Sequence, residues 1–253
     1  MGYQDLLLKT TESTNRVAKE MGASGVLHGS GVVADTQTAG RGRLGRQWHS
    51  PPGGNLYCSY VVRPVIALQD YPKLTMVAGV AAAQCLEENS PIRMSLKWPN
   101  DLYIGTKKCG GILCESIPAS SAPFAVIGIG INCNLSASDI PEELRGMATS
   151  LLMEGDCRID TRKLFVDLRE HLLEAVSDFE KQGFSQILTR WSQFDAFKGT
   201  HMTWVREDGK PIEGINLGPD PDGSLVVQDA DGNRHKVISG DVTLAGSVPM
   251  ERS

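Results

Sequence analysis

Three arginines stand among glycines in one short segment, Gly40-Arg-Gly-Arg-Leu-Gly-Arg-Gln-Trp48. Glycines leave backbone N–H groups open to a ligand, and Arg41, Arg43 and Arg46 supply guanidinium groups. The segment therefore predicts a receptor for phosphate or carboxylate. A basic surface loop without a ligand is the alternative. The chain carries a formal net charge of −5, and three guanidinium groups gathered among glycines in an acidic protein favour the anion-binding interpretation.

The glycine spacing of this segment formally matches the dinucleotide-binding fingerprint G-x-G-x-x-G. That motif requires a helix directly after the glycines, so that the pyrophosphate meets the helix N-terminus. The residues that follow, His49-Ser-Pro-Pro-Gly-Gly-Asn55, cannot be helical. No kinase HRD or DFG element and no P-loop motif occurs either. We therefore expect a mobile glycine loop rather than a Rossmann site.

A second polar feature is Lys97-Trp-Pro-Asn-Asp101, which places an amide and a carboxylate in a turn between two expected strands. Lys108 follows in what we expect to be the next turn. A hairpin that pairs 101–104 with 111–114 would put Asp101 and Lys108 at one end of the sheet, where a phosphate ester could contact both. Solvated turn residues are the alternative interpretation.

Two further motifs could line a ligand pocket. The alternate glycines Gly128 and Gly130 leave one face of a strand bare, and Asn132 on the same face could bind a ligand edge. Close packing between strands would explain these glycines equally well. Ser13-Thr-Asn15 precedes a short helix, so we expect one hydroxyl to cap the helix and a neighbour to be able to bind a polar ligand head.

Composition excludes several classes of protein. The net charge of −5 argues against a general nucleic-acid or anionic-membrane binder. The longest apolar run, from Met76 to Leu86, is shorter than the ~20 residues that a membrane span needs. The six cysteines show no C-x-x-C spacing, so we expect reduced thiols and a cytoplasmic protein. Motifs for hydrolytic triads and for zinc catalysis are missing from the sequence.

Periodicity and turn signals predict an α+β protein. The expected strands are 31–35, 56–62, 92–97, 101–104, 111–116 and 123–131. The expected helices are a short one from the Ser13 cap to Gly22, then 71–88, 161–181 ended by Gly183, and 185–193.

The pattern changes after about residue 197. Asp-Gly pairs at Asp208, Asp222 and Asp231 separate short alternating runs, which is a strong hairpin signal. We expect a small antiparallel barrel or sheet there, and hence two domains, 1–197 and 198–253.

Five blocks of the sequence occur together in an order that resembles the biotin protein ligases (biotin–[acetyl-CoA-carboxylase] ligases). They are Thr11-Glu-Ser-Thr-Asn15, Gln37-Thr-Ala-Gly-Arg-Gly-Arg43, Lys97-Trp-Pro-Asn-Asp101, Lys108-Cys-Gly-Gly-Ile-Leu113 and Gly128-Ile-Gly-Ile-Asn132. Ala148–Leu151 and Ser239–Val242 are similar to later blocks, so the resemblance covers essentially the whole chain. It implies a mixed or antiparallel sheet flanked by helices, similar to class II aminoacyl-tRNA synthetases, with a small C-terminal SH3-like β-barrel.

The resemblance also implies a two-step reaction. The biotin carboxylate attacks the α-phosphorus of Mg²⁺-ATP to give biotinyl-5′-AMP and pyrophosphate, and a lysine of a biotin carboxyl carrier protein domain then takes the biotinyl group. The nearest rival is a lipoate or octanoate ligase or transferase of related fold. A non-catalytic binding module that keeps the pocket is a rival of another class.

Site residues follow from the matching blocks, as what the resemblance implies. Arg43, Lys108 and Asp101 would be catalytic. Biotin would be bound by Ser13, Thr14, Asn15, Gln37, Arg41, Gly42, Arg43, Lys108, Gly111, Gly128 and Gly130. ATP would be bound by Arg43, Arg46, Trp48, Asn100, Lys108 and Asn132. No metal ligand is assigned.

Relatives that double as repressors carry an N-terminal winged helix-turn-helix. Only 12 residues precede Ser13, so we expect no such domain and no nucleic-acid partner. Neither do we expect a membrane partner. Family members form both monomers and dimers, and the sequence leaves a homodimer open.

Overall fold

The computed structural model describes residues 2–118, 123–205, 211–237 and 241–244. Seven strands form one mixed sheet in the order β1-β2-β3-β7-β6-β5-β4. Only the β1–β2 pair of this sheet is parallel. The strands are β1 (Leu6–Thr11), β2 (Gly31–Gln37), β3 (Leu56–Val62), β4 (Ser95–Lys97), β5 (Asp101–Ile104), β6 (Lys107–Ile117) and β7 (Phe124–Ile131).

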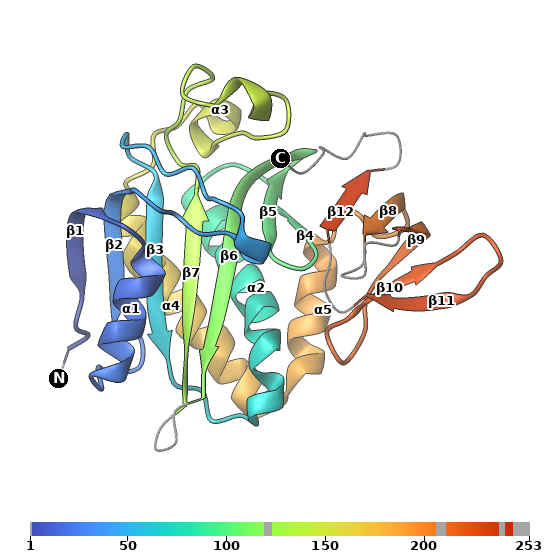
Figure 1. Cartoon of the computed structure of the whole chain (residues 1–253), viewed down its shortest axis with the longest axis horizontal. Helices are drawn as coiled ribbons and strands as arrows, with labels where there is room; N and C mark the ends of the chain where they lie inside the picture. Colours follow the sequence, from blue (N-terminus) through green and yellow to red (C-terminus); the bar gives the residue numbers. More distant parts are fainter. Residues whose placement is uncertain (1, 119–122, 206–210, 238–240, 245–253) are drawn as a thin grey trace.

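Helices cover both faces of the sheet, as the family resemblance implied (Figure 1). Side chains on β3 alternate between the faces. Cys58 and Tyr60 join the large core under α2 and α4, whereas Val61 packs with Ala18 of α1 on the other face. The helices are α1 (Thr14–Ala23), α2 (Leu74–Asn89), α3 (Leu151–Gly155), α4 (Thr161–Gln182) and α5 (Phe184–Phe194), with short 3₁₀ turns at Arg43–Gly45, Leu68–Lys73 and Glu142–Leu144.

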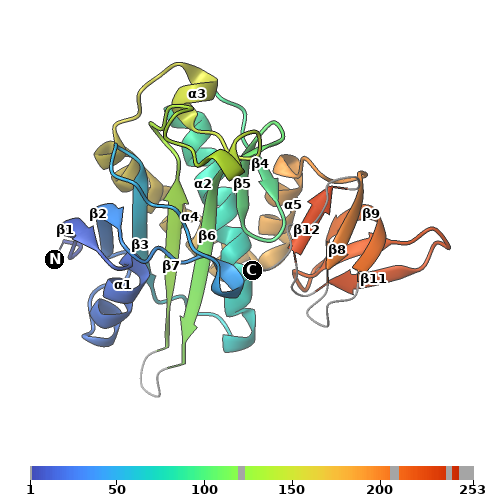
Figure 2. The ribbon, with the colours of Figure 1, turned by 45° about the horizontal axis from the view of Figure 1, so that its top comes forward.

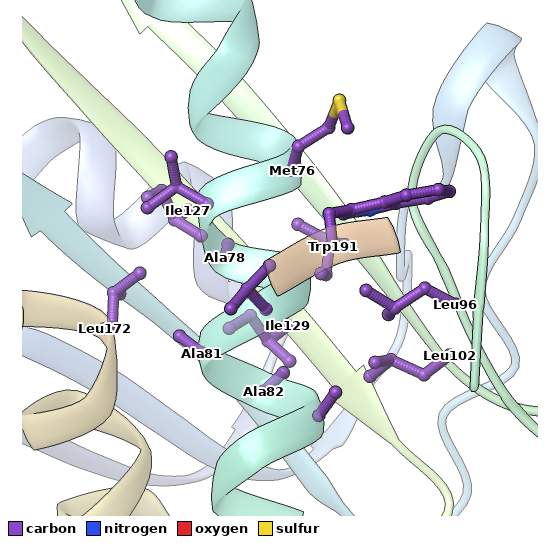
Figure 3. Close-up of a cluster of buried hydrophobic side chains, with 14 of the residues drawn as sticks. Met76, Ala78, Ala81, Ala82, Leu96, Leu102, Ile127, Ile129, Leu172 and Trp191 are labelled. Carbon is purple, nitrogen blue, oxygen red and sulfur yellow. The ribbon is translucent and has the colours of Figure 1, made fainter. Parts of the chain in front are cut away.

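Helix α2 lies at the centre of the main core (Figure 3). Its alanines and other apolar residues are buried almost all round, which is the pattern of a helix enclosed by other elements. Ile127 and Ile129 of β7 pack against it from the sheet, and Leu172 of α4 and Trp191 of α5 pack from other sides. The site-bearing strands are thus fixed from behind by a rigid apolar layer.

A second sheet of five antiparallel strands follows α5 and lies beside it (Figure 2). The indole Nε1 of Trp98 donates to the carbonyl of Gly223 at 3.0 Å, which ties this sheet to the turn before β5. Turns at Asp222 and Asp231 join β9 to β10 and β10 to β11, as expected, whereas the Asp208 turn lies outside the described residues. The strands are β8 (His201–Val205), β9 (Pro211–Pro219), β10 (Leu225–Gln228), β11 (Arg234–Val237) and β12 (Asp241–Leu244).

Three local predictions were wrong. Ser13 stands at the N-cap of α1, but its side chain makes no capping hydrogen bond; the first N–H of the helix, that of Thr14, donates instead to the side chain of Gln37 at 2.9 Å. Gly22 lies inside α1, which ends at Ala23. Lys108 lies within β6 rather than in a turn, and β6 pairs with β5 from Lys107 onward, so the hairpin turn is the Gly105 region. Strand β1 was not predicted.

Leu102 of β5 tests the packing of the main core. It is 0% exposed and faces α2. We expect Leu102→Ala to lower the free energy of unfolding by about 2–5 kcal/mol, the usual cost of a cavity at a buried leucine. Leu7→Ala on β1, where leucine is 59% exposed, is the matched control and should change stability by less than about 0.5 kcal/mol. Urea denaturation measures both, and equal effects would contradict the assigned core.

Candidate active site

A cavity of about 680 Å³ opens on the face of the sheet that carries α1. The glycine–arginine loop (residues 40–48) and the segment 135–148 lie around it. Every site residue predicted from the sequence lines this cavity. These residues are Ser13, Thr14, Asn15, Gln37, Arg41, Gly42, Arg43, Arg46, Trp48, Asn100, Asp101, Lys108, Gly111, Gly128, Gly130 and Asn132. The structure brings them together, and the role of each stays a prediction.

Lys108 and Asp101 form an ion pair at one end of the cavity, with Nζ 2.7 Å from Oδ1. A strict strand alternation would place Lys108 and Gly111 on opposite faces of β6. The pairing of β5 with β6 instead skips Cys109, and this bulge turns Lys108 to the same side as Gly111. The bulge therefore delivers the ammonium group into the cavity while the Cys109 side chain stays buried in the core.

The glycine–arginine loop is closed by its own backbone. Trp48 N–H donates to the carbonyl of Gly40 at 2.9 Å, and Gly42 N–H donates to that of Arg46 at 2.7 Å. Leu44 at the tip takes a left-handed conformation with φ of 55°. In Figures 1 and 2 this blue segment crosses in front of β7 and β6. The loop is thus a small hairpin laid over the sheet.

Arg43 connects the loop to the Lys108 end of the cavity. Its guanidinium donates to Oδ1 of Asn100 at 3.2 Å. The Asn100 amide is fixed in turn, since its Nδ2 donates to the carbonyl of Ile112 at 2.8 Å. Arg43 and Lys108 therefore bring two positive charges to a region whose paired carboxylate is that of Asp101.

Trp48 fills the bare face that the alternate glycines leave. An added Cβ would lie 2.6 Å from the indole Nε1 at Gly130 and 3.3 Å from the ring at Gly111. The ring also lies 5.4 Å from the Lys108 ammonium, within range of a cation–π contact. Its Nε1 is buried without a hydrogen-bond partner. The glycines thus make room for an indole ring whose N–H is buried and unpaired.

Polar side chains form a neutral floor at the other end of the cavity. Oε1 of Gln37 accepts from the N–H and the hydroxyl of Thr14, at 2.9 and 3.2 Å. The Ser59 hydroxyl of β3 donates to Oδ1 of Asn15 at 2.6 Å and lies 2.8 Å from the Thr14 hydroxyl. Gly128 is required here because a Cβ would meet Oδ1 of Asn15 at 1.9 Å. These groups offer neutral donors and acceptors rather than charge.

Sequence reasoning missed two residues of this network, Ser59 and Glu115. Glu115 accepts from Asn15 Nδ2 at 2.9 Å and from Lys19 Nζ at 2.5 Å. Burial alone would raise the pKa of the Glu115 carboxyl, but these hydrogen bonds and the charge of Arg41 hold the pKa below its usual value. Ser59 gave a signal, because it is a small polar residue in the largely apolar run Leu56–Val62, whereas Glu115 gave none, because β6 carries other charged residues.

The segment 135–148 was also missed, and it forms an apolar wall. Leu135, Ile140 and Leu144 line the cavity. Backbone hydrogen bonds hold the segment to β6. The N–H of Lys108 donates to the carbonyl of Met147 at 2.8 Å, and the N–H of Thr149 donates to the carbonyl of Lys108 at 2.9 Å. Its sequence shows neither strand nor helix periodicity, so only the fold reveals its position.

Other kinds of chemistry find no support within the described part of the chain. It holds no group of three histidine, cysteine or acidic residues that could bind a metal ion. Cys58 lines the cavity, but burial raises the pKa of its thiol to about 12, so the nucleophilic thiolate is not formed near neutral pH. Among the described residues, no helix combines the length and hydropathy of a membrane span.

The chain is similar to known proteins over almost its full length. Residues 7–132 match the model of the biotin/lipoate A/B protein ligase family. The bifunctional ligase/repressor BirA of Bacillus subtilis is 37% identical over 96% of this chain and 73% of its own length. The biotin–[acetyl-CoA-carboxylase] ligase of Mycobacterium tuberculosis is 30% identical over 95% of this chain and 89% of its own length.

A solved structure shows the same similarity in three dimensions. The biotin protein ligase of Aquifex aeolicus, in complex with biotin and ATP, superposes with a TM-score of 0.80 at 31% identity, covering 95% of this chain and 97% of that one. Sequence, fold and cavity agree, and the chain belongs to the biotin protein ligases of the biotin/lipoate A/B protein ligase family.

Proposed function

We propose that this protein joins biotin to ATP as biotinyl-5′-AMP and then transfers the biotinyl group to a lysine of a biotin carboxyl carrier protein domain. The observation that carries the proposal is one cavity with a neutral polar floor at one end and Arg43 and Lys108 at the other. Such a cavity suits a molecule with an uncharged polar head and a carboxylate tail that must meet a phosphate.

The first step brings two anions into contact. Enzymes usually overcome such repulsion with fixed cations that offset the negative charge of the transition state. In our proposal Arg43 and Lys108 contact the α-phosphate while a biotin carboxylate oxygen forms a bond to phosphorus and pyrophosphate leaves. In the second step the amine of the acceptor lysine attacks the acyl carbon and AMP leaves, with Asp101 orienting the reacting groups. No enzyme nucleophile takes part.

The head of biotin is a bicyclic urea. We place it on the floor formed by Ser13, Thr14, Asn15 and Gln37, with Arg41 and Gly42 closing over it. The chain of biotin then runs past the Trp48 ring, which packs on the glycine positions of β6 and β7, toward Lys108. Adenine stacks on Trp48, with Asn132 and the apolar wall beside it, and Arg46 faces the phosphates. The Asp101 carboxylate at the phosphate end of the cavity fits Mg²⁺ that is carried on the triphosphate, since this cation is usually held by substrate phosphates and one or two carboxylates.

Three further proposals concern the whole molecule. The chain divides into a catalytic domain, 1–197, and a C-terminal SH3-like domain, 198–253. The segment between α5 and β8, together with the five antiparallel strands, supports this division. The protein works in the cytoplasm, where its acceptor carboxylases and ATP are found. Its acceptor is a carrier domain that must bring a lysine to the mouth of the cavity.

Pyrophosphate exchange tests the proposed function directly. The protein is incubated with ATP, labelled pyrophosphate and one acid at a time. Label should enter ATP when biotin is present and not with lipoate or octanoate. Exchange with lipoate or octanoate instead would favour the ligases of related fold, and a folded protein without exchange would favour a non-catalytic binding module.

Arg43→Ala tests the loop. Because one fixed charge is removed from the phosphate, we expect adenylate formation to fall by ~10²-fold or more, and bound adenylate to escape faster because the loop loses its link to Asn100. Single-turnover assays measure the rate, and retention on a filter measures the escape. Arg93→Ala, at a side chain that is 94% exposed, is the control. If the variant forms adenylate at the wild-type rate and retains it equally well, Arg43 has no part in the mechanism.

Gly130→Val tests the glycine face of β7. The added side chain would occupy the space of the Trp48 ring, whose Nε1 lies 2.6 Å from the first added carbon. We expect biotin binding, measured by calorimetry, to be lost while circular dichroism stays unchanged. Gly2→Val, at a glycine with open space around it, should bind normally. A folded Gly130→Val protein with normal affinity would show that this strand is not a pocket wall.

A further inference from the structure

Glu115 lies on the cavity face of β6 but does not itself line the cavity. Its side chain is 20% exposed and joins groups from two other segments. Oε1 accepts from Lys19 Nζ of α1 at 2.5 Å and lies 3.7 Å from the Arg41 guanidinium of the loop. Oε2 accepts from Asn15 Nδ2 at 2.9 Å. One carboxylate thus contacts helix α1 at two points and the glycine–arginine loop at a third.

The contact with Asn15 determines which atoms that amide offers to a ligand. Nδ2 has two hydrogens, and both are used, by Glu115 Oε2 at 2.9 Å and by the carbonyl of Leu113 at 3.2 Å. Oδ1 therefore points away from β6 and accepts from Ser59 at 2.6 Å. An amide oxygen has two lone pairs, so Oδ1 keeps one acceptor position. Asn15 can accept an N–H from a ligand but cannot donate to one.

The loop is held at two separate points. Arg41 contacts Glu115 at the polar-floor end, and Arg43 contacts Asn100 at the phosphate end. The Arg41 side chain is 56% exposed, so solvent weakens its pairing with Glu115. The two shorter bonds, to Lys19 and Asn15, are the stronger ones. Loss of the carboxylate should therefore act first on Asn15 and the polar floor.

We propose that Glu115 is a positioning residue for biotin: it fixes the Asn15 amide as an acceptor for a ureido N–H and holds the Arg41 end of the loop over the bound acid. This inference rests on the proposed function and deepens it. It assigns Glu115 to the retention of the acid and of the adenylate. The nucleotide is contacted at the opposite end of the cavity, so its binding does not depend on Glu115.

Glu115→Gln keeps the size of the side chain and removes its charge. The new amide has one acceptor oxygen, so Asn15 or Lys19 is left facing an N–H group. We expect the KM for biotin in pyrophosphate exchange to rise about ten-fold, the usual effect of losing one charge-assisted hydrogen bond. The KM for ATP should stay within two-fold. Release of adenylate, followed by filter retention, should become faster by a similar factor.

A second variant separates positioning from general stability. Lys19 does not line the cavity, and Lys19→Met alone should leave both KM values near those of the wild type. In the double variant Lys19→Met/Glu115→Gln, no ammonium competes for the amide oxygen, so Asn15 regains its acceptor and the KM for biotin should return toward the wild-type value. The double variant also serves as the test if Glu115→Gln alone does not fold, with a biotin KM near that of the wild type as the expected result.

The outcomes are distinct. A biotin KM within two-fold of the wild type in Glu115→Gln, a parallel rise in the KM for ATP, or a double variant whose biotin KM stays about ten-fold raised would each overturn the inference. Glu170→Gln, an exposed carboxylate on α4, is the control and should behave as the wild type. A wild-type protein without biotin-dependent exchange would instead count against the proposed function.

Discussion

Repulsion between a carboxylate and a phosphate is the constraint on which the rest of this structure depends. Two anions approach only where fixed positive charge offsets their repulsion and where water does not have to reorganise. In this fold the Lys108 ammonium is held beside Asp101, and the Arg43 guanidinium is held by Asn100, both at one end of a single cavity. In the proposed function, the remaining site residues position the two substrates relative to these charges.

The sheet positions the site residues because successive side chains of a strand point to opposite faces. On the core side, β3 and β7 carry apolar residues such as Tyr60, Ile127 and Ile129 that pack under α2, whereas beside the cavity the opposite face of the same strands carries Ser59, Gly128 and Gly130. Gly128 admits the Asn15 amide and Gly130 admits the Trp48 ring, each closer than a Cβ would allow. A polar floor and an aromatic side chain can thus approach the backbone while the opposite face remains a rigid apolar layer.

Much of this arrangement could be predicted from the sequence, because the helices and strands follow from local patterns of apolar and polar residues. The run 56–62 forms β3 as expected, and the apolar face of 161–181 forms α4. The errors came from long-range contacts. Gln37, distant in sequence, binds the first N–H of α1 where a cap by Ser13 was expected, and Lys108 owes its direction to a bulge that no periodicity shows. Ser59 and Glu115 were overlooked because their partners on α1 are distant in sequence. The packing of Trp48 against Gly111 and Gly130 likewise needs the folded sheet.

The central claim is that Arg43 and Lys108 share one phosphate. A crystal structure of the protein with a non-hydrolysable analogue of biotinyl-5′-AMP tests it most directly. The account predicts the phosphate, or the group that replaces it, in contact with both side chains, and the bicyclic ring on the floor formed by Thr14, Asn15 and Gln37. An analogue bound with its phosphate away from Lys108, or with its ring outside that floor, would contradict the account.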